Sequence, residues 1–228
     1  MTTRPQPLMT LTTFFLAALL LSGCATTRQT RSVEVTGFLG DYSMLEEGKR
    51  GEAQLLYIDE SVDFSRYDSV MIDTVTIWYS ERTKKLDPKD EQRLTDYFYH
   101  AIHEELFEAF RIVNEPGPNV LRVRAALTEA RGARVIGNAV TSIVPQARLL
   151  ATVGGAVTDV QVFVGRAAGE VEITDSMTGQ RLVAAVDERS GTKAIRSGLL
   201  KWSDAKEIFE FWGERFRERL TELGVRKK

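Results

Sequence analysis

The chain has 228 residues, of which 43% are hydrophobic and 27% charged, a length and composition that suit one globular domain with its own core. Its 30 basic and 32 acidic residues nearly balance, so it lacks the basic excess of nucleic-acid-binding proteins and no nucleic-acid partner is expected. Cys24 is the single cysteine, which excludes a disulfide within the chain and a zinc site built from thiolates.

The N-terminal segment carries the strongest signal in the sequence. An apolar run from Leu8 to Leu21 follows the positive charge of Arg4 and ends at Ser22-Gly23-Cys24. This run is shorter than the roughly 20 apolar residues of a membrane span, and an ordinary secretory signal would leave a free thiol beside the cleavage site. The pattern therefore predicts a lipobox, with residues 1–23 as signal peptide and Cys24 as the lipidation site, where acyl chains such as palmitate hold the protein to a membrane.

The segment after the lipobox indicates a short tether. Residues 24–36 are expected to form the lipidated cysteine and the tether, and residues 37–228 a single globular α+β domain. Ala25 to Arg31 is polar and without apolar periodicity, and such a stretch spans at most about 30 Å, so the domain should stay close to its own leaflet. Gly37 to Leu45 holds several apolar residues and is expected to pack onto the domain.

Helical and alternating periodicities predict a mixed domain. One helix is expected from the Asp87-Pro88 cap to Phe110, and a second from Ser203 to Leu223. Strands are expected over Ala53–Ile58, Ser69–Trp78, Arg111–Val113, Val120–Arg131, Val160–Val164, Gly169–Asp175 and Arg181–Glu188. The elements favour an α+β fold, a two-layer sandwich in which two long amphipathic helices cover a mixed sheet of about six strands.

Two details of the strands lead to specific expectations. Alternation slips inside Ser69–Trp78, so a bulge is expected at Asp73-Thr74, and parallel pairing of this strand with Val120–Arg131 would make a right-handed crossover.

Arg122 and Arg124 share one face of their strand, as Glu170 and Glu172 do of theirs. If these strands are neighbours, the four charges pair across them; separately solvated charges are the alternative.

Gly132 to Thr158 does not fit a plain sandwich. The segment mixes Gly, Ala, Val and Leu around Pro145, too apolar for a free loop and too rich in glycine for a span. One interpretation is a covering segment with a short helix near Pro145 to Thr152, and Leu149, Leu150 and Val153 would then share a helical face. The alternative is an apolar patch that faces lipid or a partner.

Candidate chemistry is sparse. His100 and His103 lie three residues apart on the first expected helix, but no third ligand can be named and their order differs from that of zinc peptidases. We find no Gly-x-Ser-x-Gly, no Gly-x-Gly-x-x-Gly and no phosphate loop. The sequence therefore predicts no catalytic, cofactor-binding or metal-binding residues and a protein that is not an enzyme.

Several blocks together resemble a known family. They are the lipobox, Phe64-Ser65-Arg66-Tyr67-Asp68, the run Leu121–Thr128, and Glu172-Ile173-Thr174-Asp175-Ser176 through Arg189. The chain resembles an uncharacterised family of bacterial envelope lipoproteins, domain of unknown function 3313. The resemblance implies a lipoprotein of Gram-negative-type bacteria, and it brings no catalytic residues. Ala25 after the lipidated cysteine is similar to a signal for outer-membrane sorting, and this resemblance implies the periplasmic face of that membrane as the expected location.

Three function classes follow. The first is a non-catalytic accessory or interaction lipoprotein, attached to the membrane through Cys24 and open to an envelope protein partner. The second binds a lipid or another apolar ligand, with Gly132 to Thr158 as part of a groove. An envelope enzyme is the third.

Overall fold

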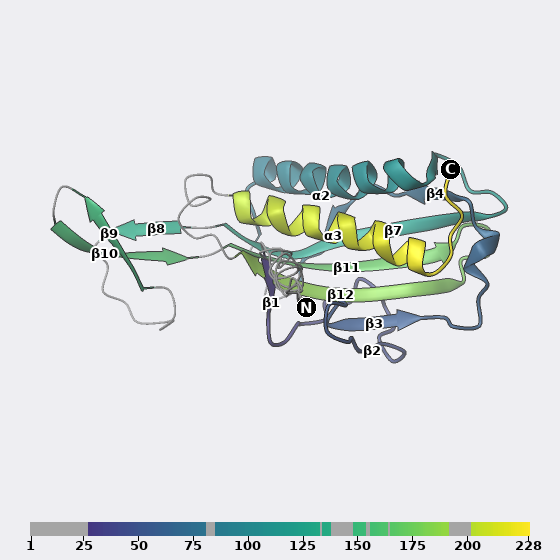
Figure 1. The fold of residues 1–228 in the computed structure, drawn as a ribbon, viewed down its shortest axis with the longest axis horizontal. Coiled ribbons are helices and arrows are strands. Elements are labelled where there is room, and N and C mark those ends of the chain that lie inside the picture. Colours follow the sequence, from purple (N-terminus) through teal and green to yellow (C-terminus); the bar gives the residue numbers. More distant parts are fainter. Residues whose placement is uncertain are drawn as a thin grey trace, which may run out of the picture.

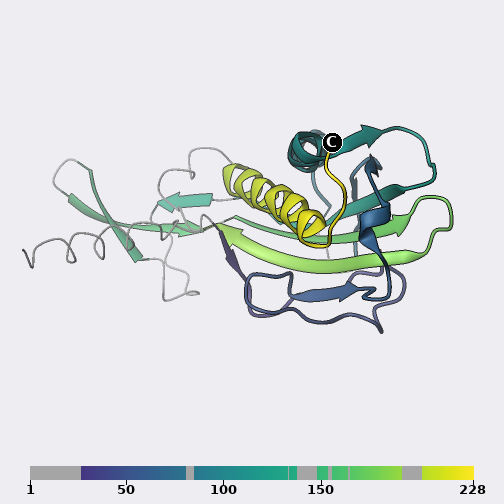
Figure 2. The ribbon, with the colours of Figure 1, turned by 45° about the vertical axis from the view of Figure 1, so that its right-hand side comes forward.

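The main body is a curved sheet with two helices on one face (Figures 1 and 2). The structure, a computed structural model, describes residues 27–80, 85–132, 134–137, 148–153, 156–163, 165–191 and 202–228, the three ranges between 134 and 163 by their backbone. The strands of the main sheet are β1 (Thr27–Gln29), β2 (Glu46–Glu47), β3 (Leu55–Ile58), β4 (Ser69–Ile72), β5 (Thr76–Ile77), β6 (Arg111–Val113), β7 (Val120–Arg131), β11 (Arg166–Asp175) and β12 (Arg181–Gly191). Their order is β2-β3-β12-β11-β7-β4-β6, with β1 beside β12 and β5 beside β7.

The α+β class and the mixed sheet are confirmed, but the strand number is wrong. The described sheet has nine strands rather than about six, because β1, β2 and β5 are too short for a sequence period. The chain contains one extra residue at the position of the expected bulge. Three residues separate Ile72 from Thr76, whereas two separate their partners Val123 and Ala126 on β7. β4 pairs with β7 in parallel, as the crossover requires.

The two helices begin and end close to where the sequence predicts. Helix α2 (Pro88–Ala109) is capped by Asp87, whose carboxylate accepts from the Lys89 N–H at 2.9 Å. Helix α3 (Ser203–Glu222) packs beside it, at a contact where an added Cβ on Gly213 would lie 2.4 Å from the Ala101 carbonyl oxygen. Neither helix is apolar enough to span a bilayer, and the described part of the chain holds no other candidate.

The core lies between the helices and the sheet. Buried residues of α2 and α3 meet buried residues of the central strands, among them Leu94, Phe98, Ile102, Leu106, Leu121, Val123, Leu127, Ile208, Phe209 and Leu220. The opposite face of the sheet is also covered, by the segment 33–45, whose Leu39 packs against Ala184 and Val186. The expected packing of Gly37 to Leu45 onto the domain is therefore confirmed.

The cross-strand charges pair only in part as expected. β7 and β11 are antiparallel neighbours, and Arg124 stands opposite Glu172, with Nη1 and Oε2 2.8 Å apart. Arg122 instead binds Asp73 with two nitrogens at 2.8–3.0 Å. Glu170 is 1% exposed, not solvated, because the segment 33–45 covers this face.

The predicted tether over residues 24–36 is wrong for Thr27–Gln29, and also for Val33 and Thr36, which pack onto the sheet with the segment 33–45. Thr27–Gln29 form β1, which pairs with β12 in the register Thr27↔Gly191 to Gln29↔Arg189. Thr27 is buried, and its hydroxyl accepts from Arg189 Nε at 2.7 Å. Unpaired backbone groups at the end of β12 explain why so polar a segment adopts a strand. Residues 1–26, with the predicted signal peptide and Cys24, lie outside the described residues.

Gly132 to Thr158 contains strands where a short helix was expected. β8 (Arg134–Gly137), β9 (Arg148–Val153) and β10 (Ala156–Phe163) form a separate three-stranded antiparallel sheet in the order β8-β10-β9. The expectation of a helix near Pro145 to Thr152 is wrong for its described part, since pairing with β10 selects a strand. Figures 1 and 2 show this sheet beyond one end of the main sheet, away from the helices.

Candidate functional site

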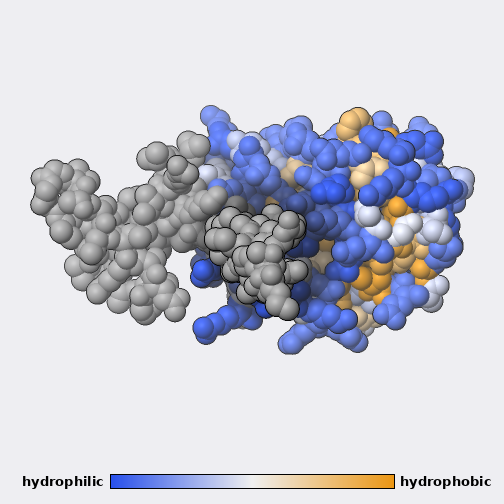
Figure 3. Space-filling view, viewed as in Figure 1, coloured by the Kyte–Doolittle hydropathy of each residue, from blue (hydrophilic) through white to orange (hydrophobic). Residues whose placement is uncertain are grey.

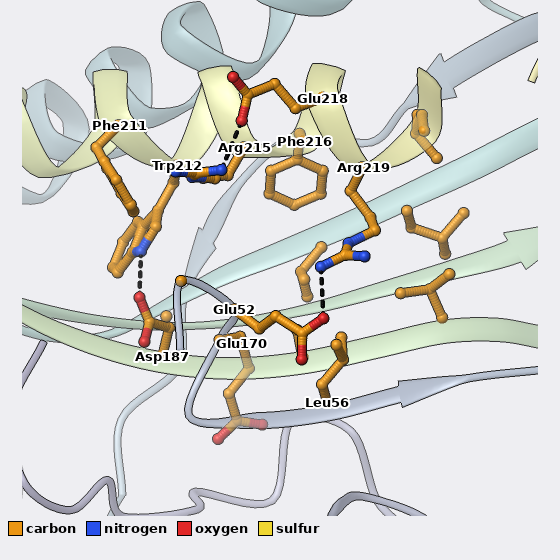
Figure 4. Close-up of a pocket in the computed structure, with 18 of the residues that line it drawn as sticks. Glu52, Leu56, Glu170, Asp187, Phe211, Trp212, Arg215, Phe216, Glu218 and Arg219 are labelled. Atoms are coloured by element: carbon orange, nitrogen blue, oxygen red, sulfur yellow. Dashed lines mark hydrogen bonds and ion pairs between the residues drawn. The ribbon is translucent and has the colours of Figure 1, made fainter. Parts of the chain in front are cut away.

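An apolar cavity lies beneath α3. Its volume is about 140 Å³, and it is bounded by α3, by β11, β12 and β3, and by the loop around Glu52 (Figure 4). Val171 and Ala185 belong to the two central strands under the helix, yet they are only half-buried. Their incomplete burial shows that α3 does not seal the sheet at this point.

Strand alternation decides which residues face the cavity. On β11 and β12 the helix-facing positions include Val171, Ile173, Val183 and Ala185, and Leu56 of β3 extends this apolar floor. Residues between them face the other way.

Glu170 illustrates the opposite orientation. It lines the cavity through its backbone side, while its carboxylate points away from α3 (Figure 4). On the far face that carboxylate accepts from Thr36 N at 2.8 Å and from the Tyr42 hydroxyl at 2.5 Å. Burial and the Glu170 carboxylate both raise the pKa of Tyr42. The Glu170 carboxylate therefore binds the segment 33–45 on the far face of the sheet and is not part of the cavity.

Aromatic side chains of α3 form the roof. Phe211 and Phe216 are half-buried along the cavity, and Trp212 is buried between them. The Trp212 ring lies 5.3 Å from Phe98 and 5.9 Å from Phe209, so it is held in an aromatic cluster. A rigid apolar roof over an apolar floor suits a ligand without charge.

One end of the cavity is closed by polar groups. The Trp212 Nε1–H donates to Asp187 Oδ2 at 2.8 Å, and Gln29 Nε2 donates to Asp187 Oδ1 at 2.7 Å. The Arg189 guanidinium stacks over Phe211 at 3.8 Å, and burial lowers the pKa of Arg189. Because Gln29 is in β1, this end of the cavity is tied to the N-terminal strand.

The mouth opens between α3 and the loop around Glu52. Arg219 Nη2 contacts Glu52 Oε1 at 2.8 Å, an ion pair that joins the helix to the loop (Figure 4). The Lys49 N–H donates to the same carboxylate at 2.7 Å, and this hydrogen bond, with Arg219, lowers the pKa of Glu52. Figure 3 shows apolar residues gathered between the C-terminal half of α3 and β3, within a hydrophilic surface.

The size of the cavity sets what it can hold. A closed apolar cavity of about 150 Å³ remains dry and accepts benzene or xenon, so this cavity suits one ring or a short length of hydrocarbon chain. Its open side allows a larger molecule to extend outward.

The residues predicted from sequence lie elsewhere. Cys24 is outside the described residues, and its lipidation stays a prediction. His103 stacks between Tyr99 and Phe107, with ring centroids 5.7 and 5.8 Å away, and His100 is exposed on the same helix. Among the described residues no three His, Cys, Asp or Glu side chains are grouped to hold a metal.

Sequence reasoning missed the cavity. Val171, Val183 and Phe216 follow the periodicity of buried residues, and a cavity wall has the same periodicity as a packed core. Ala185 is a small residue in the middle of its strand, which is a weak signal of a gap in the packing. Interpreting it requires the pairing of β12 with β3 and the position of α3 over both strands.

Known proteins include relatives of this chain. The family described as "Protein of unknown function (DUF3313)" matches residues 34–216. This chain belongs to the DUF3313 family. The "Uncharacterized lipoprotein YdcL" of Escherichia coli K12 is 26% identical to it over 180 residues, 76% of this chain and 78% of YdcL. The resemblance to an uncharacterised lipoprotein family is therefore confirmed.

Solved structures give distant likenesses to this DUF3313 chain. A PelC dodecamer from Paraburkholderia phytofirmans is 11% identical with a TM-score of 0.34, covering 68% of this chain and 96% of that one. A neuraminyllactose-binding hemagglutinin homolog from Helicobacter pylori is 9% identical with a TM-score of 0.34, covering 72% and 87%. At these TM-scores neither likeness bears on function.

Proposed function

We propose that this DUF3313 protein is a lipid-anchored protein of the cell envelope that binds a small apolar ligand, or the apolar part of a larger one, beneath α3. The observation that carries the proposal is the cavity of about 140 Å³ over the half-buried Val171 and Ala185. Covering apolar surface contributes about 25 cal/mol per Å², and an apolar ligand in the cavity gains this contribution, from which the entropic cost of association is subtracted.

The proposed anchor is Cys24, joined to lipid through its thiol and made the first residue by removal of residues 1–23, on the periplasmic face of the outer membrane. The lipobox and Ala25 support this placement, and the lipoprotein name of YdcL supports the lipid anchor alone. Two or more acyl chains make release from a bilayer negligible.

The proposed role is binding without turnover. This agrees with the accessory role expected from the sequence, because an anchored domain can hold or present a ligand, alone or to an envelope protein, without changing it. The floor and roof of the cavity are hydrocarbon and aromatic, and the charged Asp187 and Glu52 at its edges are paired with Trp212 and Arg219, whereas acid–base or nucleophilic catalysis needs polar groups placed at the ligand.

A fluorescence titration tests the binding site. N-phenyl-1-naphthylamine, a neutral apolar fluorophore, is expected to bind the wild-type protein, to gain emission and to change the fluorescence of Trp212. Ala185→Leu fills part of the cavity with a larger side chain, so it is expected to weaken binding about tenfold or more. A tenfold weaker Kd corresponds to a loss of about 1.4 kcal/mol of binding free energy.

Two further variants make the titration specific. Glu214→Leu adds the same side chain at an exposed position of α3 and should leave binding unchanged. Phe216→Ala enlarges the cavity and should shift preference toward larger apolar probes. Equal affinity in the wild type, Ala185→Leu and Phe216→Ala, all with unchanged circular dichroism, would show that the fluorophore binds elsewhere and would refute the site.

A further inference from the structure

The three-stranded sheet β8-β10-β9, here called the ribbon, has two chemically different faces. In antiparallel sheets paired residues lie on the same face, and neighbours along a strand on opposite faces. The register pairs Val160 with both Leu149 and Gly137, and Gln161 with Arg148 and Ile136. The backbone therefore decides which residues share a face.

One face of the ribbon carries no charge. Its nine positions are Val135, Gly137, Leu149, Ala151, Val153, Ala156, Thr158, Val160 and Val162. The other face holds Arg134, Ile136, Arg148, Leu150, Thr152, Val157, Asp159, Gln161 and Phe163. The helical face expected for this segment is thus replaced by a strand pattern that separates Leu149 from Leu150.

The ribbon starts from the end of the main sheet where the chain enters it. Register positions place Arg28 of β1, Ser190, Arg166 and Arg131 in one row across β1, β12, β11 and β7. Neighbouring strands are about 4.8 Å apart, so this row is about 14 Å wide. β8 follows β7 and β10 precedes β11, and both connections therefore leave from this row.

The same row lies close to the proposed anchor. Three Cα–Cα steps separate Cys24 from Thr27, the first residue of β1, and such a stretch reaches about 10 Å at most. A bilayer that holds the acyl chains of Cys24 is therefore within about 10 Å of the start of β1, beside the base of the ribbon. The short connection therefore keeps the base of the ribbon near the membrane surface.

We infer that the ribbon lies on the phospholipid bilayer that anchors the protein, with its uncharged face at the level of the headgroups and upper acyl chains. The inference rests on the proposed anchoring at Cys24 and extends it by a second contact that orients the domain. We place the ribbon at the surface of the bilayer and not through it, because the outer edges of β8 and β9 have no strand partner among the described residues and unpaired backbone groups are not tolerated in hydrocarbon.

Site-specific fluorescence tests the contact in the full-length protein. The thioether to lipid would block the thiol of Cys24, the single native cysteine, so Val160→Cys or Gln161→Cys supplies one reactive thiol for the fluorophore nitrobenzoxadiazole. In vesicles of phosphatidylethanolamine and phosphatidylglycerol, nitroxide-labelled lipids should quench the label at position 160 severalfold more than the label at position 161. Leu149→Cys and Leu150→Cys form a second matched pair with the same expectation, in case one variant folds poorly.

The outcomes separate the alternatives. Weak and equal quenching at all four positions would overturn the inference. A label at position 160 that is shielded from water but not quenched by lipid nitroxides would mean that protein, such as a second copy, covers this face, which also overturns it. Labelling of Cys24 in the wild type would refute the anchoring itself, and the two pairs would then be compared in the Cys24→Ser background with added vesicles.

Discussion

Asp175 is a buried carboxylate at the end of β11 whose charge is used for structure. Its Oδ1 accepts from Met177 N and Thr178 N at 3.0 and 2.9 Å, and its Oδ2 from the Tyr67 hydroxyl and Arg66 at 2.9 and 2.7 Å. Burial raises the pKa of Asp175, but these donors outweigh burial and bring it to about 2. Aspartate at a turn commonly accepts hydrogen bonds from nearby backbone groups, as Asp175 does from Met177 and Thr178, whereas Tyr67 and Arg66 are brought to it by the fold.

Acid stability should reflect this group. Because the folded pKa of about 2 lies below the ordinary aspartate pKa of 3.8, Asp175 contributes about 2 kcal/mol to the free energy of unfolding above about pH 4, and this is lost as the pH falls toward 2. Asp175→Asn is therefore expected to be less stable than the wild type by about that amount near neutral pH. Urea unfolding at several pH values should show the difference shrinking below about pH 4. A difference independent of pH would contradict the assignment.

The elements differ in how well the sequence predicts them. Helix α2 was predictable because Asp87-Pro88 is a local start signal and Leu94, Phe98 and Ile102 repeat on one face. β1 was not, since the polar segment Thr27–Gln29 is a strand only through its pairing with β12. β9 shows the same tertiary control, because its apolar residues fit a helical and a strand period about equally well.

Close approach of the two helices leads to a prediction about Gly213. A Cβ at this position would lie 2.4 Å from the Ala101 carbonyl oxygen, so Gly213→Ala should force α2 and α3 apart. We expect the free energy of unfolding to fall by about 1–3 kcal/mol, even though alanine stabilises a helix by about 1 kcal/mol relative to glycine. Glu214→Ala, one residue on and exposed, should stay within about 0.5 kcal/mol of the wild type. Thermal unfolding measures both, and a Gly213→Ala variant as stable as the wild type would disprove the contact.

At the scale of the whole molecule, the class of fold was predictable, but the segments that cover each face of the sheet were not. Glu170 and Glu172 alternate with apolar residues, a pattern that indicates one buried and one solvated face. The segment 33–45 covers the second face instead and satisfies Glu170 with Thr36 and Tyr42. The cavity depends on how far α3 stands from β12, a spacing that no local pattern specifies.

The anchor is the other property of the whole molecule. Replacing Cys24 by Ser removes the thiol that forms the thioether to lipid, so cells fed radioactive palmitate should label the wild-type protein and not Cys24→Ser. The variant is expected to accumulate as an uncleaved precursor or to leave the lipidated fraction. Ala25→Ser, which keeps the thiol, serves as the control and should remain labelled. Labelling of Cys24→Ser at the wild-type level would refute the lipobox.

Binding beneath α3 is tested most directly by locating a ligand in crystals of the protein. A brominated apolar probe, 1-bromonaphthalene, gives an anomalous signal that marks its position without assumptions about affinity. We predict a bromine peak between α3 and β12, within van der Waals contact of Phe216, Val171 or Ala185. A peak elsewhere on the molecule, or none at saturating probe, would contradict the proposal that the cavity is the binding site.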